Sequence, residues 1–229
     1  MTEKAQDKWV LYYKNRPSIA HIYPEGFVVR MFRSKFPEPF FDQTPQPGAK
    51  ILDLSCGYGR NLPFLLAEGF DVYASEIASD IVERLRREFD GSGVQFDVGL
   101  ANNLPYECDF FDGVLACNSC YYIEEGSTFH DNLEEIARVI KPGGFFGGTA
   151  LRHSHSIFRE AEQITKNCAI ISDDKQGIRK HSLMAYFEDE SQLEAALEPL
   201  FAHQKIASLH EDFAGFRRHL YYFTATKSH

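Results

Sequence analysis

The stretch from Ile51 to Arg60 constrains the fold of this 229-residue chain more than any other. Its first four residues, Ile-Leu-Asp-Leu, are mostly apolar, and the next six, Ser-Cys-Gly-Tyr-Gly-Arg, contain two glycines. Glycine adopts positive φ without steric cost and lets another group lie close to the backbone. The pattern predicts a buried strand that ends in a sharp, open turn at Gly57 and Gly59.

A second strand is predicted from Asp71 to Glu76, and it ends in a carboxylate. Open α/β sheets bind ligands at the carboxyl ends of their strands, so we expect Glu76 to lie beside the glycine turn. There its two oxygens can accept the protons of two ribose hydroxyls. The two features together predict a site for an adenosine-containing cofactor.

Two cofactors compete for such a site. A nicotinamide dinucleotide carries a pyrophosphate and favours a third small residue after the two glycines, but Leu62 stands there. A short-chain dehydrogenase also needs a tyrosine four positions before a lysine, and none of the eleven tyrosines has one. S-adenosylmethionine has no phosphate, so close backbone approach and the ribose acid suffice. The residues favour S-adenosylmethionine, with the dinucleotide as the alternative.

The rest of the chain alternates between predicted helices and strands, which is typical of a doubly wound α/β sheet with helices on both faces. Two β-rich runs, His203–His210 and Arg217–Thr226, are expected to close the fold as a hairpin. Further strands are predicted at Val94–Val98, Gly113–Cys117 and Gly144–Leu151. The predicted helices are Asp7–Asn15, Glu25–Lys35, Asn61–Glu68, Ser79–Phe89, Thr128–Val139 and Glu190–Leu200.

Four motifs between about Ala49 and Phe146 follow the order found in one enzyme family. They are the loop Asp53-x-Ser55-x-Gly57-x-Gly59, the acid Glu76, the segments Leu104-Pro105-Tyr106 and Phe111-Asp112-Gly113-Val114, and the turn Arg138-Val139-Ile140-Lys141-Pro142-Gly143-Gly144. On these residues the chain resembles the class I S-adenosylmethionine-dependent methyltransferases, particularly those that act on small molecules. The resemblance implies a Rossmann-like seven-stranded sheet, mostly parallel with an antiparallel last strand, and S-adenosylhomocysteine as the product.

The chain departs from the family pattern at two positions. Ser55 replaces the first loop glycine, which is a mild change because serine is small. Leu100 stands where the family often has an aspartate that reads the adenine amine. We therefore expect adenine to be held by the backbone at Leu100 and Ala101 and by apolar contact with Ile77. Asp97 is an alternative partner, but its register is wrong.

Other contacts to the cofactor follow from the resemblance. Asp53 is expected to cap the glycine loop and to reach the cofactor's ammonium. Asn118, at the end of the fourth core strand, is expected to reach the cofactor's methionine part or the substrate. In the family an N-terminal helix often folds over the cofactor, and an aromatic ring there can attract the sulfonium as a cation–π partner. We assign this role to Tyr13.

The predicted domain organisation has three parts. Residues 1–48 form an N-terminal helical lid, which ends in a Pro-rich linker, and residues 49–229 form the methyltransferase domain. Within that domain, residues 152–187 read as an irregular insertion that is longer than a usual connection. This segment concentrates basic residues in an acidic chain. We expect it to cap the substrate.

A general base is needed only where the acceptor must lose a proton, and histidine suits that task near neutral pH. His153 and His155 are the first candidates, since residues two apart on a strand face the same side, and His181 is the third. Their spacing lacks a third ligand for a metal, so no metal site is predicted. Cys117 and Cys120 are interpreted as buried structural residues.

Charge and hydropathy limit the function. Asp and Glu total 33 against 24 Lys and Arg, a net charge of −9, which disfavours nucleic-acid substrates. No apolar run reaches the ~20 residues that span a bilayer, and no signal peptide is recognised, so we expect a cytoplasmic protein of unspecified oligomeric state. The sequence predicts methyl transfer to oxygen or nitrogen of a small polar molecule. A NAD(P)-dependent oxidoreductase and a cofactor-binding regulator without chemistry are the alternatives.

Overall fold

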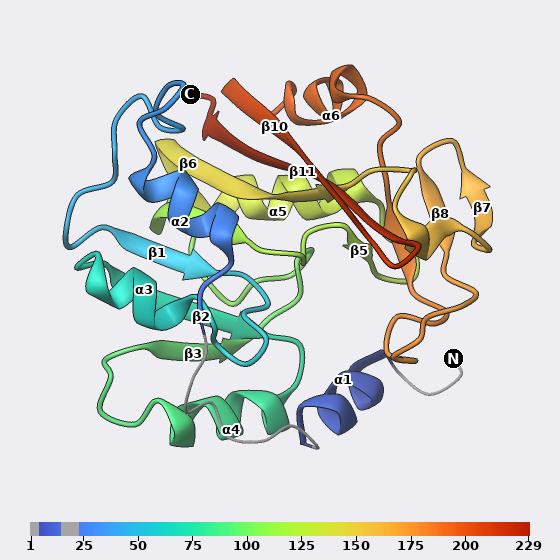
Figure 1. Cartoon of the computed structure of the whole chain (residues 1–229). Coiled ribbons are helices and arrows are strands. Elements are labelled where there is room, and N and C mark those ends of the chain that lie inside the picture. Colours follow the sequence, from blue (N-terminus) through green and yellow to red (C-terminus); the bar gives the residue numbers. More distant parts are fainter. Residues whose placement is uncertain (1–4, 15–22) are drawn as a thin grey trace.

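The central sheet has seven strands in the order β10-β11-β6-β4-β1-β2-β3 (Figure 1). In this computed structural model, which describes residues 5–14 and 23–229, β11 runs antiparallel to β6 and β10, and the other neighbours are parallel. The predicted fold class is therefore confirmed. The strands are β1 (Lys50–Asp53), β2 (Asp71–Glu76), β3 (Gln95–Val98), β4 (Phe111–Ala116), β6 (Ile140–Leu151), β10 (Phe201–Phe213) and β11 (Phe216–Lys227).

Helices cover both faces of this sheet because successive strand residues point to opposite sides. Ile51 packs in a cluster with α2 (Gly26–Arg33), α3 (Leu62–Ala67) and α4 (Ser79–Glu88). Its neighbour Leu52 packs in a second cluster. That cluster contains residues of α5 (Phe129–Val139) and α6 (Glu190–Leu197). All six predicted helices are present, with ends that differ by a few residues, and Asn15 of the first one lies outside the described residues.

The topology fixes where a ligand binds. Strand β1 pairs with β2 on one side and with β4 on the other, so the chain winds away from β1 in both directions. In such sheets the loops at the carboxyl ends of the central strands separate and leave a crevice. The glycine loop after β1, Glu76 at the end of β2 and Asn118 after β4 all lie at this edge.

The 152–187 segment is not irregular as predicted. It contains a short 3-10 helix, η1 (Ser156–Phe158), and three strands, β7 (Glu162–Thr165), β8 (Cys168–Ile170) and β9 (Leu183–Ala185). These strands form a second sheet with β5 (Tyr122–Ile123), in the order β5-β9-β8-β7. Beneath it lies a cluster of buried side chains of its own, which includes Tyr121, Phe158, Ile171, Met184 and Tyr186.

Helix α1 (Ala5–Lys14) lies below the 152–187 segment in Figure 1. The Lys8 Nζ atom donates to the backbone oxygen of Lys180 over 2.9 Å. The Trp9 ring meets the Tyr122 ring of β5 with their centroids 6.1 Å apart. Helix α1 thus contacts the second sheet as well as the core. In the described part of the chain every helix is too short or too polar to cross a membrane.

Candidate active site

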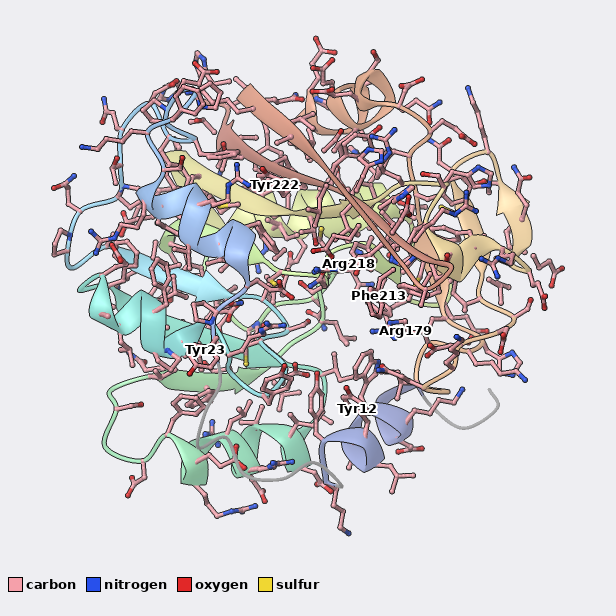
Figure 2. The ribbon with its side chains drawn as sticks, viewed as in Figure 1. Tyr12, Tyr23, Arg179, Phe213, Arg218 and Tyr222 are labelled. Atoms are coloured by element: carbon pink, nitrogen blue, oxygen red, sulfur yellow. The ribbon has the colours of Figure 1, made fainter. Side chains whose placement is uncertain are left out.

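A cavity of about 1380 Å³ opens at the carboxyl ends of β1, β2 and β4. Helix α1, the core loops, β5, the 152–187 segment and the tip of the β10–β11 hairpin all contribute to its wall. Figure 2 shows Tyr12, Arg179 and Arg218 around the space between α1 and the hairpin. Of the predicted cofactor residues, the wall contains Tyr13, Asp53, Ser55, Gly57, Glu76, Ile77, Leu100, Ala101 and Asn118.

Glu76 is buried and tied to the glycine loop. Its Oε1 accepts the backbone N–H of Gly57 over 2.6 Å, and its Oε2 accepts that of Ile77 over 3.0 Å. Burial raises the pKa of Glu76 to about 7, and these two hydrogen bonds oppose the rise. A carboxylate has about four acceptor sites, so two of them stay available for hydroxyl donors in the cavity.

Asp53 is equally buried but lacks such support. Neither of its oxygens has a hydrogen-bond partner among the described residues. Burial raises the pKa of Asp53 to about 7, and the nearby Asn61 side chain and Arg60 oppose this only in part. A buried polar group without a partner is costly. An ammonium or another donor in the cavity would supply the missing partner, so the residues fit the predicted cofactor.

The loop between β1 and α3 has three residues at positive φ, namely Ser55 at 53°, Gly57 at 67° and Gly59 at 76°. A Cβ at Gly57 would lie 2.8 Å from the Tyr13 hydroxyl. A Cβ at Gly59 would lie 2.7 Å from the Phe89 ring. Gly59 does not line the cavity. Its missing side chain lets the Phe89 ring, just after α4, pack against the loop, and its contact with the cofactor stays a prediction.

The three residues predicted to hold adenine all lie in the cavity wall. Leu100 and Ala101 line the cavity beside Ile77. The backbone N–H of Leu100 donates to the backbone oxygen of Asn103 over 3.0 Å, and the two residues form an isolated antiparallel β-bridge that closes this turn. Asp97 does not line the cavity, and its carboxylate lies 4.0 Å from the Arg86 guanidinium.

Asn118 lies at the end of β4 with a positive φ of 59°. Its backbone N–H donates to the Thr149 hydroxyl over 2.8 Å, and the same hydroxyl donates back to its Oδ1 over 3.3 Å. Thr149 is fully buried in β6. The neighbouring strand therefore fixes the position from which Asn118 faces the cavity.

Tyr13 closes the cavity above the glycine loop. Its ring stacks on Trp9 with centroids 5.7 Å apart and meets the edge of Tyr58 at 6.3 Å. Its hydroxyl approaches the backbone at Gly57, as described above. An aromatic side chain thus lies over the part of the cavity that contains Glu76.

The two candidate histidines occupy different places. His153 does not line the cavity, and its Nδ1 lies 3.1 Å from Glu188 at the surface. His155 lines the cavity, and its Nδ1 accepts the backbone N–H of Ile157 over 3.1 Å. In the neutral ring the proton is then on Nε2, which makes the remaining nitrogen a donor. This geometry argues against a general base at either position. His181, the third candidate, lines the cavity, and its role as a base stays a prediction.

Sequence reasoning missed the charged residues of the wall that come from other elements. Arg60 Nη1 and Arg218 Nη2 both contact Glu25 Oε1, at 2.7 and 3.3 Å. These three residues are separated by up to 193 positions in the chain. A concentration of basic residues in the 152–187 segment was the signal that could have led to Arg179, but nothing local indicated Arg218.

The cysteines carry no separate site. All five are free, and burial raises the pKa of Cys120 to about 12. Within residues 5–14 and 23–229, no group of three or more His, Cys, Asp or Glu is arranged to hold a metal ion.

A family model described as a methyltransferase domain matches residues 51–144. This range contains the glycine loop, Glu76 and the turn after α5. The chain carries a class I methyltransferase domain.

Relatives and solved structures agree with this assignment. A fatty-acid O-methyltransferase of Mycolicibacterium smegmatis is 32% identical over 118 residues, which cover 50% of this chain and 42% of that protein. The chain thus aligns with less than half of that relative. A Burkholderia thailandensis 1,6-didemethyltoxoflavin-N1-methyltransferase, solved with S-adenosylhomocysteine, is 21% identical at a TM-score of 0.55 and covers 80% of this chain and 72% of its own.

One similar structure extends beyond the methyltransferase domain. The cyclase SpnF superposes with a TM-score of 0.63 at 17% identity, over 97% of this chain and 94% of that chain. The likeness to this structure therefore spans nearly the whole chain and is not limited to residues 51–144. At this identity the likeness concerns the fold alone.

Proposed function

We propose that this protein transfers the methyl group of S-adenosylmethionine to oxygen or nitrogen of a small polar molecule. The observation that carries the proposal is the pair of buried carboxylates, Glu76 and Asp53, in one cavity. Glu76 is already oriented by two backbone donors, and Asp53 lacks a partner. A cofactor with neighbouring hydroxyls and a cationic amino-acid part satisfies both.

The chain's own residues would hold the cofactor as follows. Glu76 accepts ribose hydroxyls and Asp53 accepts the ammonium, while Gly57 allows close backbone approach. Leu100, Ala101 and Ile77 pack against adenine. Bound S-adenosylmethionine supplies an electrophilic methyl group on a sulfonium. Tyr13 provides an aromatic face for that charge, and the acidic residues at this end of the cavity favour a cation.

The protein's contribution to rate is then alignment. Holding two reactants in line is worth roughly 7–11 kcal/mol of the barrier, and no general base is required for an acceptor that is already ionised. We propose that, of the N-terminal part, helix α1 acts as a lid and that residues 152–187 act as a cap, because the two meet where Lys8 contacts Lys180. Together they exclude water from the cavity. Helix α2, which was predicted as part of the same lid, packs against the central sheet instead.

Two alternatives stay testable. An NAD(P)-dependent oxidoreductase is disfavoured by Leu62, a buried bulky residue where such loops favour a small one. A cofactor-binding regulator without methyl transfer has the same cofactor residues. The named acceptors of the two methyltransferases above, a fatty acid and 1,6-didemethyltoxoflavin, differ too much to define one for this chain.

Calorimetry distinguishes these functions. The protein should bind S-adenosylmethionine or S-adenosylhomocysteine tightly and nicotinamide dinucleotides negligibly. The opposite ranking would overturn the proposal. Transfer of a labelled methyl group to an added acceptor then separates an enzyme from a regulator.

A further inference from the structure

The charged residues that line the cavity are distributed unevenly along the sequence. Among its lining residues up to position 126 there are five acids and two cations, namely Glu25, Asp53, Glu76, Glu124, Glu125, Lys8 and Arg60. Among those from position 151 on, five cations outnumber three acids: Arg159, Lys175, Arg179, Lys180, Arg218, Glu160, Asp173 and Asp174. We call the part of the wall around Asp53 and Glu76 the acidic end and the second group the basic end. The acidic end suits a cationic cofactor, so the basic end suits a ligand of the opposite charge.

Arg179 is the residue of the basic end best placed for an anion. Its side chain is 31% exposed and lies at the central space in Figure 2. Its hydrogen bonds to Asp174 and Gln176 both leave from Nη1 and are long, at 3.5 and 3.3 Å. A guanidinium has five N–H donors in a planar fork that matches a carboxylate. These bonds engage only part of that fork.

The turn that carries Arg179 is built to hold it in place. The nearly buried Asp174 accepts the backbone N–H of Arg179 over 2.9 Å and that of Gln176 over 3.3 Å. The Tyr122 side chain of β5 also interacts with the Arg179 guanidinium. The guanidinium is thus oriented before any ligand arrives, which lowers the entropic cost of binding.

Arg218 approaches the same region from β11. Its guanidinium is anchored by Glu25 at 3.3 Å and Glu211 at 3.1 Å, and it keeps 30% of its side chain exposed. Because these carboxylates already neutralise much of its charge, Arg218 is a secondary contributor. Two partly neutralised arginines favour a ligand with one negative charge over one with two.

His155 lies near enough to both arginines for their charges to act on its ring. Burial lowers the pKa of His155 to about 4, and the positive charges of Arg179 and Arg218 contribute. The ring is therefore neutral near pH 7, and Nδ1 is occupied by the Ile157 N–H, so Nε2 carries a hydrogen. A neutral donor beside two cations adds a third hydrogen bond for an anion and no acceptor that would repel it.

The remaining wall of the basic end is mainly apolar. Its apolar residues are Leu151, Ile157, Ile170, Ile178, Leu183, Met184, Ala214, Phe216 and Leu220, and besides His155 its uncharged polar residues are Ser156, Gln176, His181 and Ser182. A ligand with a charged group and an apolar or aromatic body fits this mixture.

We propose that the basic end binds the carboxylate of an organic acid, with Arg179 as the primary ligand and Arg218 and His155 as further donors, so that the methyl acceptor is a monoanionic acid with an apolar body. Only the identification of the bound acid as the methyl acceptor rests on the proposed function. The carboxylate site itself rests on the contacts described above. His155 is then a binding residue.

Pairs of ligands that differ only in charge test this site. The probes are 4-hydroxybenzoate with 4-hydroxybenzamide and octanoate with octanamide, titrated by calorimetry with and without saturating S-adenosylhomocysteine. At least one acid should bind at least 10-fold more tightly than its amide. Arg179→Gln should weaken that acid by about 10- to 150-fold, the loss of charge-assisted hydrogen bonds, and leave the amide unchanged.

Arg217→Gln is the matched control, because Arg217 is an exposed neighbour of Arg218 that does not line the cavity. It removes the same charge and should leave acid binding unchanged. Equal binding of acid and amide, no binding of either acid, or an equal loss in Arg217→Gln would each overturn the carboxylate site. S-adenosylhomocysteine affinity is measured in the same proteins. Unchanged affinity in the variants shows that they are folded, whereas a wild-type protein that does not bind it would contradict the proposed function and leave the carboxylate site to be judged by the acids alone.

Discussion

The two ends of the cavity are built in different ways. The acidic end comes from loops after β1 and β2, and Gly57 and Glu76, which hydrogen-bond directly, are 19 positions apart. The basic end draws on Arg179 of the 152–187 segment and on Arg218 of β11, which Glu25 of the N-terminal part anchors. Local sequence is sufficient to build the first end, whereas the second exists only after the whole chain has folded.

The ends also differ in how their charges are supported. Asp53 and Glu76 are fully buried carboxylates whose pKa values burial raises to about 7. Arg179 and Arg218 stay about one-third exposed and have acidic partners. In the free protein the acidic end therefore carries the desolvation cost of two buried carboxylates, which a cationic cofactor can offset. The basic end carries little such cost, because its arginines are partly exposed and paired. Such a cost at one end only is typical of a functional site.

The largest expected effect is at Glu76. Replacing it by alanine should weaken binding of S-adenosylhomocysteine by roughly 10- to 150-fold, which corresponds to ~1.5–3 kcal/mol, because the ribose loses charged acceptors. The melting temperature of the free protein should change little, since the hydrogen bonds from Gly57 and Ile77 are balanced by the cost of burial. Calorimetry and thermal unfolding measure the two quantities.

Two controls make the Glu76 result specific to the acidic end. Asp97→Ala removes an acid from β3 that does not line the cavity, and Arg179→Gln changes the basic end. Both should bind S-adenosylhomocysteine like the wild type. If Arg179→Gln weakens the cofactor as much as Glu76→Ala, the two ends are not separate sites.

Asp53→Asn should show opposite effects on stability and on binding. The pKa of Asp53 rises from 3.8 in an exposed state to about 7 in the folded protein. The folded protein thus binds the Asp53 carboxyl proton more tightly than the unfolded chain does. The stabilisation that this proton gives the wild-type fold is fully present below about pH 4 and is lost as the pH rises through about 7. The unfolding free energy of the variant minus that of the wild type should therefore be roughly 1–3 kcal/mol larger at pH 8 than at pH 5.

The same variant should bind the cofactor more weakly, because it lacks the charge that pairs with an ammonium. Denaturant unfolding at the two pH values and calorimetry at pH 8 give both numbers. A variant that is destabilised more at pH 8 than at pH 5 would mean that Asp53 is stabilised by a partner in the free protein.

The acidic end could be predicted because its signals are short-range. Gly57 needs a positive φ, Glu76 ends a strand with a regular apolar pattern, and both features are visible within thirty residues. The same signals do not distinguish Gly57 from Gly59, which meets the Phe89 ring and does not line the cavity, since a sequence does not reveal whether a glycine faces a ligand or a packed ring.

The basic end was largely unpredictable for a physical reason. Strands β5 and β9 have two and three residues, too few for a periodic pattern, and all four residues of β7 are exposed. Their sheet depends on pairing Tyr122 with Met184 across the chain. His153 and His155 were treated alike on the basis of strand spacing, but a turn and η1 begin there and send the two rings to different places.

Tyr13 tests whether α1 belongs to the acidic end. Tyr13→Ala should weaken S-adenosylmethionine binding by about 2- to 30-fold, as expected for loss of a cation–π contact of ~0.5–2 kcal/mol. Tyr13→Phe retains the ring and should bind nearly like the wild type. S-adenosylhomocysteine, which lacks the sulfonium charge, should respond less to the alanine change. Equal losses for both ligands would assign Tyr13 a packing role over Gly57 instead.

The smallest effect is expected at Leu100, where this chain departs from the family pattern. Leu100 lines the cavity half-buried, and its backbone is held by Asn103 independently of its side chain. Leu100→Asp should therefore leave the turn intact and place a carboxylate where it can accept the adenine amine. Cofactor affinity should stay within a few-fold of the wild type or tighten. If Leu100→Asp abolishes cofactor binding in a protein that melts normally, adenine lies against a different part of the acidic end, because a carboxylate facing an amine would not repel it.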